Sequence, residues 1–82
     1  MLSIKVFGIE GCEDCETQRR MLKKSGRDYE FFDIMGDSSE VESAGIDEVP
    51  TIIIEKNGKK FRHCGILSAH KIEEAIKFLG DK

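Results

Sequence analysis

Gly11-Cys12-Glu13-Asp14-Cys15 contains two of the three cysteines of this chain, separated by two residues. A short apolar segment, Ile4-Lys5-Val6-Phe7, precedes it, and residues compatible with a helix, 16–24, follow it. The context therefore predicts a pair of thiols at the start of a helix. Cysteines at this spacing can form a redox dithiol, half of a metal site or a buried structural pair, and the rest of the sequence bears on the choice.

The composition is that of one small domain, and we expect residues 1–82 to fold as a unit. Charged residues make up 35% of the chain and the formal net charge is -3, which argues against general binding to nucleic acid. No apolar run approaches the roughly 20 residues of a membrane span, and no secretory signal is visible. We therefore expect a cytoplasmic monomer without membrane contact. In that compartment a close cysteine pair favours catalysis or metal binding over a structural disulfide.

The first half of the chain alternates between strand and helix signals. Alternating apolar residues predict a strand over 2–7. A helix is predicted from 13 to about 25, because acidic residues fill its first turn, basic residues its later turns, and Gly26 follows. A second strand is predicted over 29–34. Two overlapping capping patterns predict a short helix over 37–44, namely Asp37-x-x-Glu40 and Ser39-x-x-Glu42.

The second half predicts a hairpin and a final helix. Ile52-Ile53-Ile54 reads as a strand that is apolar on both faces, which implies a sheet covered on both sides. Asn57-Gly58 is a strong hairpin turn signal, and a two-residue turn places Thr51 opposite Cys64. Ser68 caps the last predicted helix, whose apolar face recurs at helical spacing in Ile72, Ala75, Ile76 and Leu79.

The predicted order of elements is β-α-β-α-β-β-α, an α/β fold. A β-α-β unit requires a crossover that leaves its two strands parallel, whereas the hairpin adds an antiparallel pair. The sequence thus predicts a four-stranded mixed sheet with three helices.

This order, together with Cys-x-x-Cys at a helix start, Val49-Pro50-Thr51 before a strand and Gly65 ahead of the last helix, resembles the thioredoxin superfamily. In size the chain is similar to the glutaredoxins and the short thioredoxin-like proteins. The resemblance covers essentially the whole chain. It implies a thioredoxin fold and a dithiol–disulfide oxidoreductase that reduces protein disulfides.

The resemblance also implies roles for individual residues. Cys12 matches the nucleophilic cysteine and Cys15 the resolving one, while Pro50 matches the cis-proline of the family. In the family, the backbone of the residue before that proline holds an extended substrate segment. By position, the substrate-binding residues would be Val49, Pro50, Thr51 and Gly65. No bound metal or prosthetic group is implied, and either glutathione as co-substrate or a separate reductase would return the electrons.

Several residues depart from the family pattern. Glu13-Asp14 replaces the Gly-Pro of many thioredoxins and the Pro-Tyr of many glutaredoxins, and Val6 stands where thioredoxins commonly place a buried acid. We expect Glu13 and Asp14 to modulate the ionisation of Cys12, because nearby carboxylates oppose a second negative charge. The pair should then be a reductant rather than an oxidant. The same acids disfavour an anionic ligand such as glutathione, unless Lys5 or Arg19 offsets them.

Two other classes of function remain open at this point. Cys12 and Cys15 could hold zinc or an iron–sulfur cluster in a binding module. Alternatively, the chain could be a thioredoxin-like interaction domain without turnover. The third cysteine, Cys64, is predicted to be a small buried residue at a strand end, with a modifiable thiol as the alternative.

Overall fold

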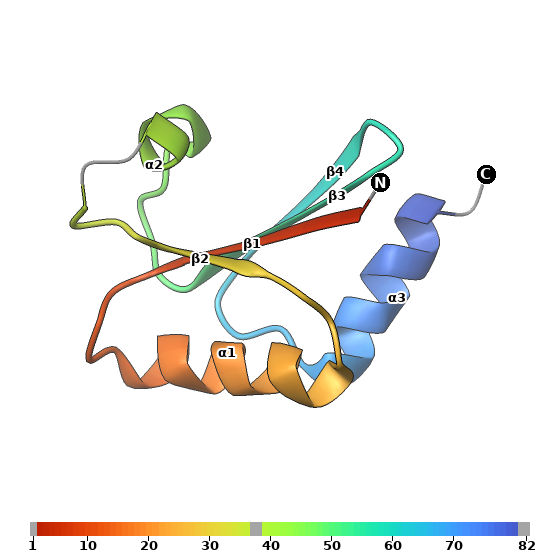
Figure 1. Cartoon of the computed structure of the whole chain (residues 1–82), viewed down its shortest axis with the longest axis horizontal. Helices are drawn as coiled ribbons and strands as arrows, with labels where there is room; N and C mark the ends of the chain where they lie inside the picture. Colours follow the sequence, from red (N-terminus) through yellow and green to blue (C-terminus); the bar gives the residue numbers. More distant parts are fainter. Residues whose placement is uncertain (1, 37–38, 81–82) are drawn as a thin grey trace.

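A four-stranded mixed sheet forms the centre of the molecule (Figure 1). The computed structural model describes residues 2–36 and 39–80. β1 pairs in parallel with β2 and antiparallel with β3, and β3 pairs antiparallel with β4. The predicted sheet and the α/β class are thus confirmed. The strands lie in the spatial order β2-β1-β3-β4, with bounds β1 (Leu2–Gly8), β2 (Glu30–Asp33), β3 (Thr51–Lys56) and β4 (Lys59–Cys64).

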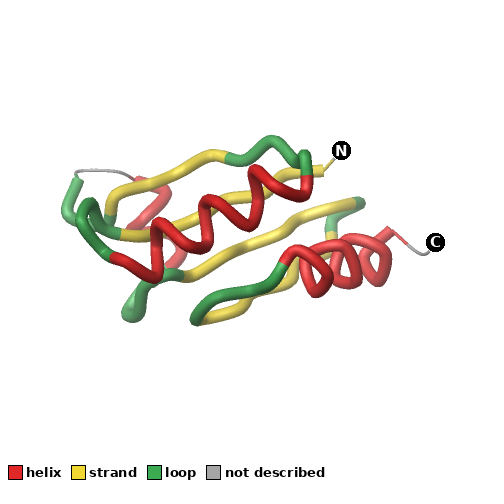
Figure 2. Tube along the Cα trace, turned by 90° about the horizontal axis from the view of Figure 1, so that it is seen from below, coloured by secondary structure: helices red, strands yellow, loops and turns green. Residues whose placement is uncertain are grey.

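Helices lie on both sides of this sheet (Figure 2). The helices α1 (Glu13–Ser25) and α3 (Ala69–Gly80) cover one face, and the short α2 (Ser39–Ala44) lies on the other. All three were predicted. Asp37, part of one predicted capping pattern, lies outside the described residues. Within 2–36 and 39–80, no helix is long and apolar enough to cross a membrane.

The main hydrophobic core lies between the sheet and the pair α1 and α3. Alternate residues of the two central strands point into it: Ile4 and Val6 from β1, Ile52 and Ile54 from β3. Leu22 of α1 is fully buried against them. The rest of this core comes from α3 and the segment before it, with Leu67, Ile72, Ala75, Ile76 and Leu79.

The opposite face of the sheet is only partly covered, which corrects the expectation of two buried faces. Ile53 points to the side of α2 and is half-buried, whereas Ile52 and Ile54 are inaccessible to solvent. The reason is the size of α2, which has six residues and no buried side chain. Arg62 of β4 holds this helix by donating hydrogen bonds to the carbonyl oxygens of Ala44 and Gly45.

Local turn and cap residues explain most of the element boundaries. Asn57 and Gly58 both have positive φ, as a tight hairpin turn requires, and Thr51 pairs with Cys64 as predicted. Gly26 ends α1 in the left-handed conformation, with its N–H bonded to carbonyl oxygens of the last turn. The second strand is shorter than the predicted 29–34, because only the residues of β2 pair with β1.

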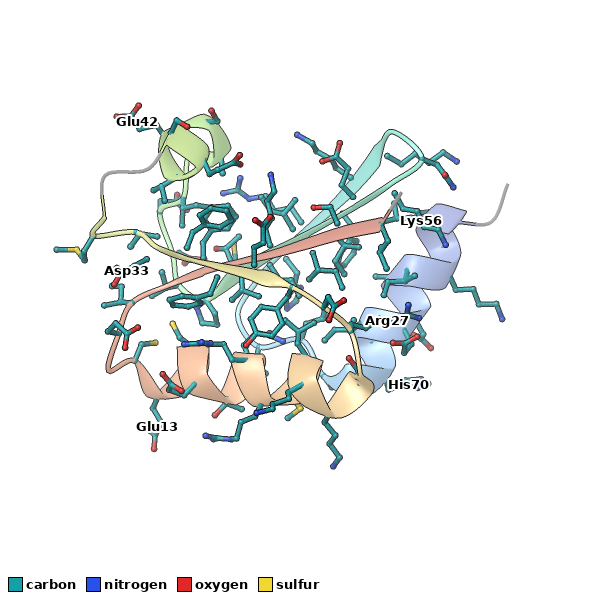
Figure 3. The ribbon with its side chains drawn as sticks, viewed as in Figure 1. Glu13, Arg27, Asp33, Glu42, Lys56 and His70 are labelled. Atoms are coloured by element: carbon teal, nitrogen blue, oxygen red, sulfur yellow. The ribbon has the colours of Figure 1, made fainter. Side chains whose placement is uncertain are left out.

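The two ends of the described chain meet at one pole of the molecule. Leu2 pairs with Lys56, whose side chain reaches the end of α3 at Gly80 (Figure 3). The other end of β1, at Gly8, leads to the start of α1. Since β1 has seven residues, the two poles lie roughly 20 Å apart.

Candidate active site

Cys12 is the residue that caps the N-terminus of α1. Its backbone is extended, and its Sγ accepts a hydrogen bond from the backbone N–H of Cys15 at 3.2 Å. The thiol is half-buried and therefore accessible. Unpaired N–H groups and the positive end of the helix dipole favour a negative charge at such a position. The predicted placement of the thiol pair at a helix start is confirmed.

Cys15 lies beneath Cys12 and is only 1% exposed. Burial, followed by the hydrogen bond with Cys12, raises the pKa of the Cys15 thiol to about 11. Cys15 therefore carries its proton at neutral pH. Its side chain packs directly on Gly8 at the end of β1, where an added Cβ would lie 2.8 Å from Sγ of Cys15. Glycine at position 8 thus allows α1 to approach the sheet this closely.

Pro50 and Gly65 lie beside these thiols. The pairing of β1 with β3, extended by one residue beyond Phe7 and Thr51, places Pro50 opposite Gly8. The peptide bond between Val49 and Pro50 is cis, as the family resemblance implies. The carbonyl oxygen of Pro50 accepts a hydrogen bond of 2.7 Å from the N–H of Gly65. The ends of β1, β3 and β4 and the start of α1 therefore meet at one site.

Val49 and Thr51 differ in their access to solvent. Thr51 is fully buried, and its hydroxyl donates to the carbonyl oxygen of Glu48 at 2.6 Å, so it supports the loop from inside. Val49 is half-buried, and its main-chain N–H and C=O make no hydrogen bond within the part of the chain that the structure describes. These two groups can pair with an extended peptide.

The carboxylates near Cys12 are exposed. Glu10, Glu13 and Asp14 all have solvent-accessible side chains, and that of Glu13 projects away from the sheet (Figure 3). The two cations suggested to offset them have other partners. Lys5 forms an ion pair of 2.8 Å with Glu40, and the Arg19 guanidinium lies 4.3 Å over the Phe31 ring and 3.9 Å from a carboxylate oxygen of Glu16, also in the first turn of α1.

Cys64 is exposed, which corrects the expectation of a buried thiol. Because it pairs with Thr51, it points to the side of α2. Its thiol stays accessible because β4 is an edge strand and α2, with six residues, covers only part of this face. His63 points to the opposite face of the sheet, where it lines a groove beside α3. Among the described residues, no three His, Cys, Asp or Glu side chains gather closely enough to hold a metal ion.

Comparison with known protein families gives one match. The glutaredoxin family model matches residues 4–61, from β1 into β4. The chain belongs to the glutaredoxin family. Family membership and the fold support a function of the thiol–disulfide oxidoreductase type. No curated protein sequence matches this glutaredoxin-family chain.

Solved thioredoxins have the same fold as this glutaredoxin-family domain. Chloroplastic thioredoxin z is 22% identical with a TM-score of 0.84, and the match covers 100% of this chain and 80% of that one. Thioredoxin-2 of the malaria parasite is 20% identical with a TM-score of 0.77, covering 95% and 82%. Schistosoma mansoni thioredoxin is 26% identical with a TM-score of 0.75, covering 95% and 78%.

Sequence reasoning missed two residues that shape the site of this glutaredoxin-family domain, Gly8 and Gln18. Gln18 is fully buried, and it bonds to the main chain of Leu67. One signal could have found it, because Gln18 occupies the helical stripe between Cys15 and Leu22, where an apolar residue is expected. No sequence signal identified Gly8, because a side chain is excluded there only by the close packing of α1 on the sheet.

Proposed function

We propose that this chain reduces disulfides of protein substrates through the dithiol of Cys12 and Cys15. The observation that carries the proposal is the contrast between the two thiols. The accessible Sγ of Cys12 receives an N–H at the start of a helix, whereas Cys15 is buried directly beneath it and protonated. An accessible thiol at the start of a helix is suited to attack, and its protected neighbour to the second step.

In the first step, the Cys12 thiolate attacks one sulfur of the substrate disulfide. The substrate S–S bond breaks, a bond between Cys12 and the substrate forms, and the released sulfur takes a proton from water. Cys15 then attacks Cys12 and gives its proton to the second substrate sulfur. The substrate gains two electrons and leaves as two thiols, while Cys12 and Cys15 become a disulfide.

The loop at Pro50 supports the binding of a polypeptide substrate. The unpaired main-chain groups of Val49 can bond to an extended segment beside Cys12. Gly65 leaves space next to Pro50, because an added Cβ there would meet no atom closer than 4.0 Å. Electrons return to the oxidised pair from glutathione or from a flavin-dependent reductase. Neither step needs a bound metal or prosthetic group.

Trapping of the mixed disulfide tests this order of events. All variants carry Cys64→Ser, so that the third, exposed thiol does not form adducts. With insulin as substrate, Cys15→Ser should accumulate a covalent adduct through Cys12, visible on a gel without reductant. Cys12→Ser should form no adduct and should not accelerate insulin reduction by dithiothreitol. Equal insulin reduction by Cys64→Ser alone and by Cys12→Ser in the same background would refute the proposal.

Two further measurements test for a metal-binding module and identify the electron donor. Metal analysis and an absorption spectrum of protein purified without chelator would reveal stoichiometric zinc or an iron–sulfur cluster, which would favour a binding module. The electron donor is found by offering the oxidised protein glutathione or a flavin reductase in turn and following the appearance of thiols.

A further inference from the structure

Gln18 links the helix that carries the thiols to the segment that precedes α3. Its Nε2 donates to the carbonyl oxygen of Leu67 at 2.9 Å, and its Oε1 accepts from the N–H of Leu67 at 2.6 Å. Both bonds are buried and span 49 positions of sequence. A buried amide with both of its groups paired has a defined orientation, because an unpaired buried group would be costly.

The segment Gly65-Ile66-Leu67 is consequently fixed at both ends. Gly65 bonds to Pro50 on one side, and Leu67 bonds to Gln18 on the other. Ile66 between them is 39% exposed, one of the large apolar side chains on the surface. Its main-chain N–H and C=O make no hydrogen bond within the described part of the chain.

Two segments with unpaired main-chain groups therefore lie next to each other. Val49 and Ile66 flank the single bond from Gly65 to Pro50. Gln18 stands one helical turn after Cys15, on the same buried stripe of α1. Its hydrogen bonds thus set the position of Ile66 relative to the helix that holds Cys12.

We propose that Gln18 is a positioning residue for polypeptide substrates. By holding Leu67, it keeps Ile66 in place as a docking edge for the chain that flanks the substrate disulfide. This inference rests on the proposed function. Gln18 touches neither thiol by hydrogen bond and acts through Leu67, so it affects recognition of a polypeptide more than attack on a disulfide.

The test compares a protein disulfide with a small one. Gln18→Met keeps the length and apolar stem of the side chain and removes both hydrogen bonds. We expect the ratio of kcat/KM for insulin to kcat/KM for bis(2-hydroxyethyl) disulfide to fall at least about fivefold, mainly through a higher KM for insulin. Ile4→Val is the control, because it weakens the same hydrophobic core and leaves both Gln18 hydrogen bonds in place, and its ratio should equal that of wild type.

A second variant covers the case in which Gln18→Met does not fold. Ile66→Ala leaves both Gln18 bonds intact and removes the exposed side chain, and it should lower the same ratio about threefold. An unchanged ratio in the folded Gln18→Met protein, or in Ile66→Ala if the former does not fold, overturns the inference. If wild type reduces neither disulfide, the proposed function fails, and the role of Gln18 falls with it.

Discussion

At the scale of single residues, the two site thiols differ more than their closeness in sequence indicates. Cys12 and Cys15 are one helical turn apart, yet one is accessible and the other is 1% exposed. The difference follows from the cap position, since the side chain of an N-cap residue folds over the helix end, whereas the third residue of the helix faces the sheet. The difference in solvent access between the two thiols is thereby built into the start of one helix.

The raised pKa of Cys15 predicts a specific dependence of stability on pH. The unfolded thiol titrates near 9.0 and the folded one at about 11. Below this window both states hold the proton, and within it only the folded state does, so stability falls as pH rises from about 9 to 11. We expect the free energy of unfolding of the reduced protein, measured with urea, to fall between about pH 8 and pH 10.5. The decrease should be on the order of 1 kcal/mol larger for wild type than for Cys15→Ala. Equal losses in the two proteins would contradict the buried thiol.

Gly8 predicts a steric effect at the same place. An added Cβ would lie 2.8 Å from Sγ of Cys15 and 3.1 Å from the Phe31 ring, so Gly8→Ala should push α1 away from the sheet. We expect a loss of roughly 1–3 kcal/mol in the free energy of unfolding, measured with urea. In a Cys15→Ala background, which lacks the sulfur, the same substitution should cost less. A penalty of the same size in both backgrounds would place the strain elsewhere.

The thiol pair could be predicted from sequence because its signals are local. The spacing of Cys12 and Cys15, the acidic first turn and Gly26 specify a capped helix without reference to other segments. The contacts of Gln18 and Lys5 could not be predicted in this way. Each bonds to a residue at least 35 positions away, and such pairs form only once the whole chain has packed.

At the scale of elements, α2 depends on a few polar contacts rather than on burial. It has six residues and no buried side chain. An ion pair joins Glu40 to Lys5 of β1, and Arg62 of β4 donates to carbonyl oxygens at its C-terminal end. The positive charge of Arg62 also complements the helix dipole at that C-terminal end. We therefore expect α2 to open locally at a lower free energy than α1 or α3.

Removal of the Arg62 contacts should loosen α2 and little else. Arg62→Met keeps the apolar stem and removes the donors, so hydrogen exchange of the backbone amides at 41–45 should accelerate about fivefold, equivalent to roughly 1 kcal/mol. Amides of β1 and β3 should keep their protection. Lys60→Met is the matched control, because Lys60 lies on the same side of β4 and makes no bond to α2. Equal acceleration in both variants would argue against the role of Arg62.

Among the elements, the hairpin is the one whose register the sequence specifies fully. A two-residue turn at Asn57-Gly58 leaves one pairing, and Ile54 opposite Phe61 follows from it. The coverage of the sheet was harder to predict. Ile53 is as apolar as its neighbours, but whether its face becomes covered depends on the length and placement of α2, which capping residues alone do not determine.

At the scale of the whole molecule, α1 and α3 are joined by polar contacts as well as by the core. The bonds from Gln18 of α1 to Leu67, just before α3, lie near the site, and just beyond the other end of α1 the guanidinium of Arg27 binds both carboxylate oxygens of Glu73 of α3 at 2.7 and 2.9 Å (Figure 3). The first contact is buried, whereas the second is partly exposed and contributes little to stability. The relative position of these helices is therefore most strongly fixed near the thiols.

The start of β1 and the end of α3 lie close together, because both contact Lys56. Their closeness affects how the domain can be joined to other proteins. Any polypeptide attached to either end departs from the pole away from Cys12. An affinity tag or a fused enzyme at that pole leaves the thiols open to a bulky substrate. Because Leu2 and Gly80 lie at the same pole, the domain is also suited to insertion into a surface loop of a host protein, with Cys12 and Cys15 at its outer end.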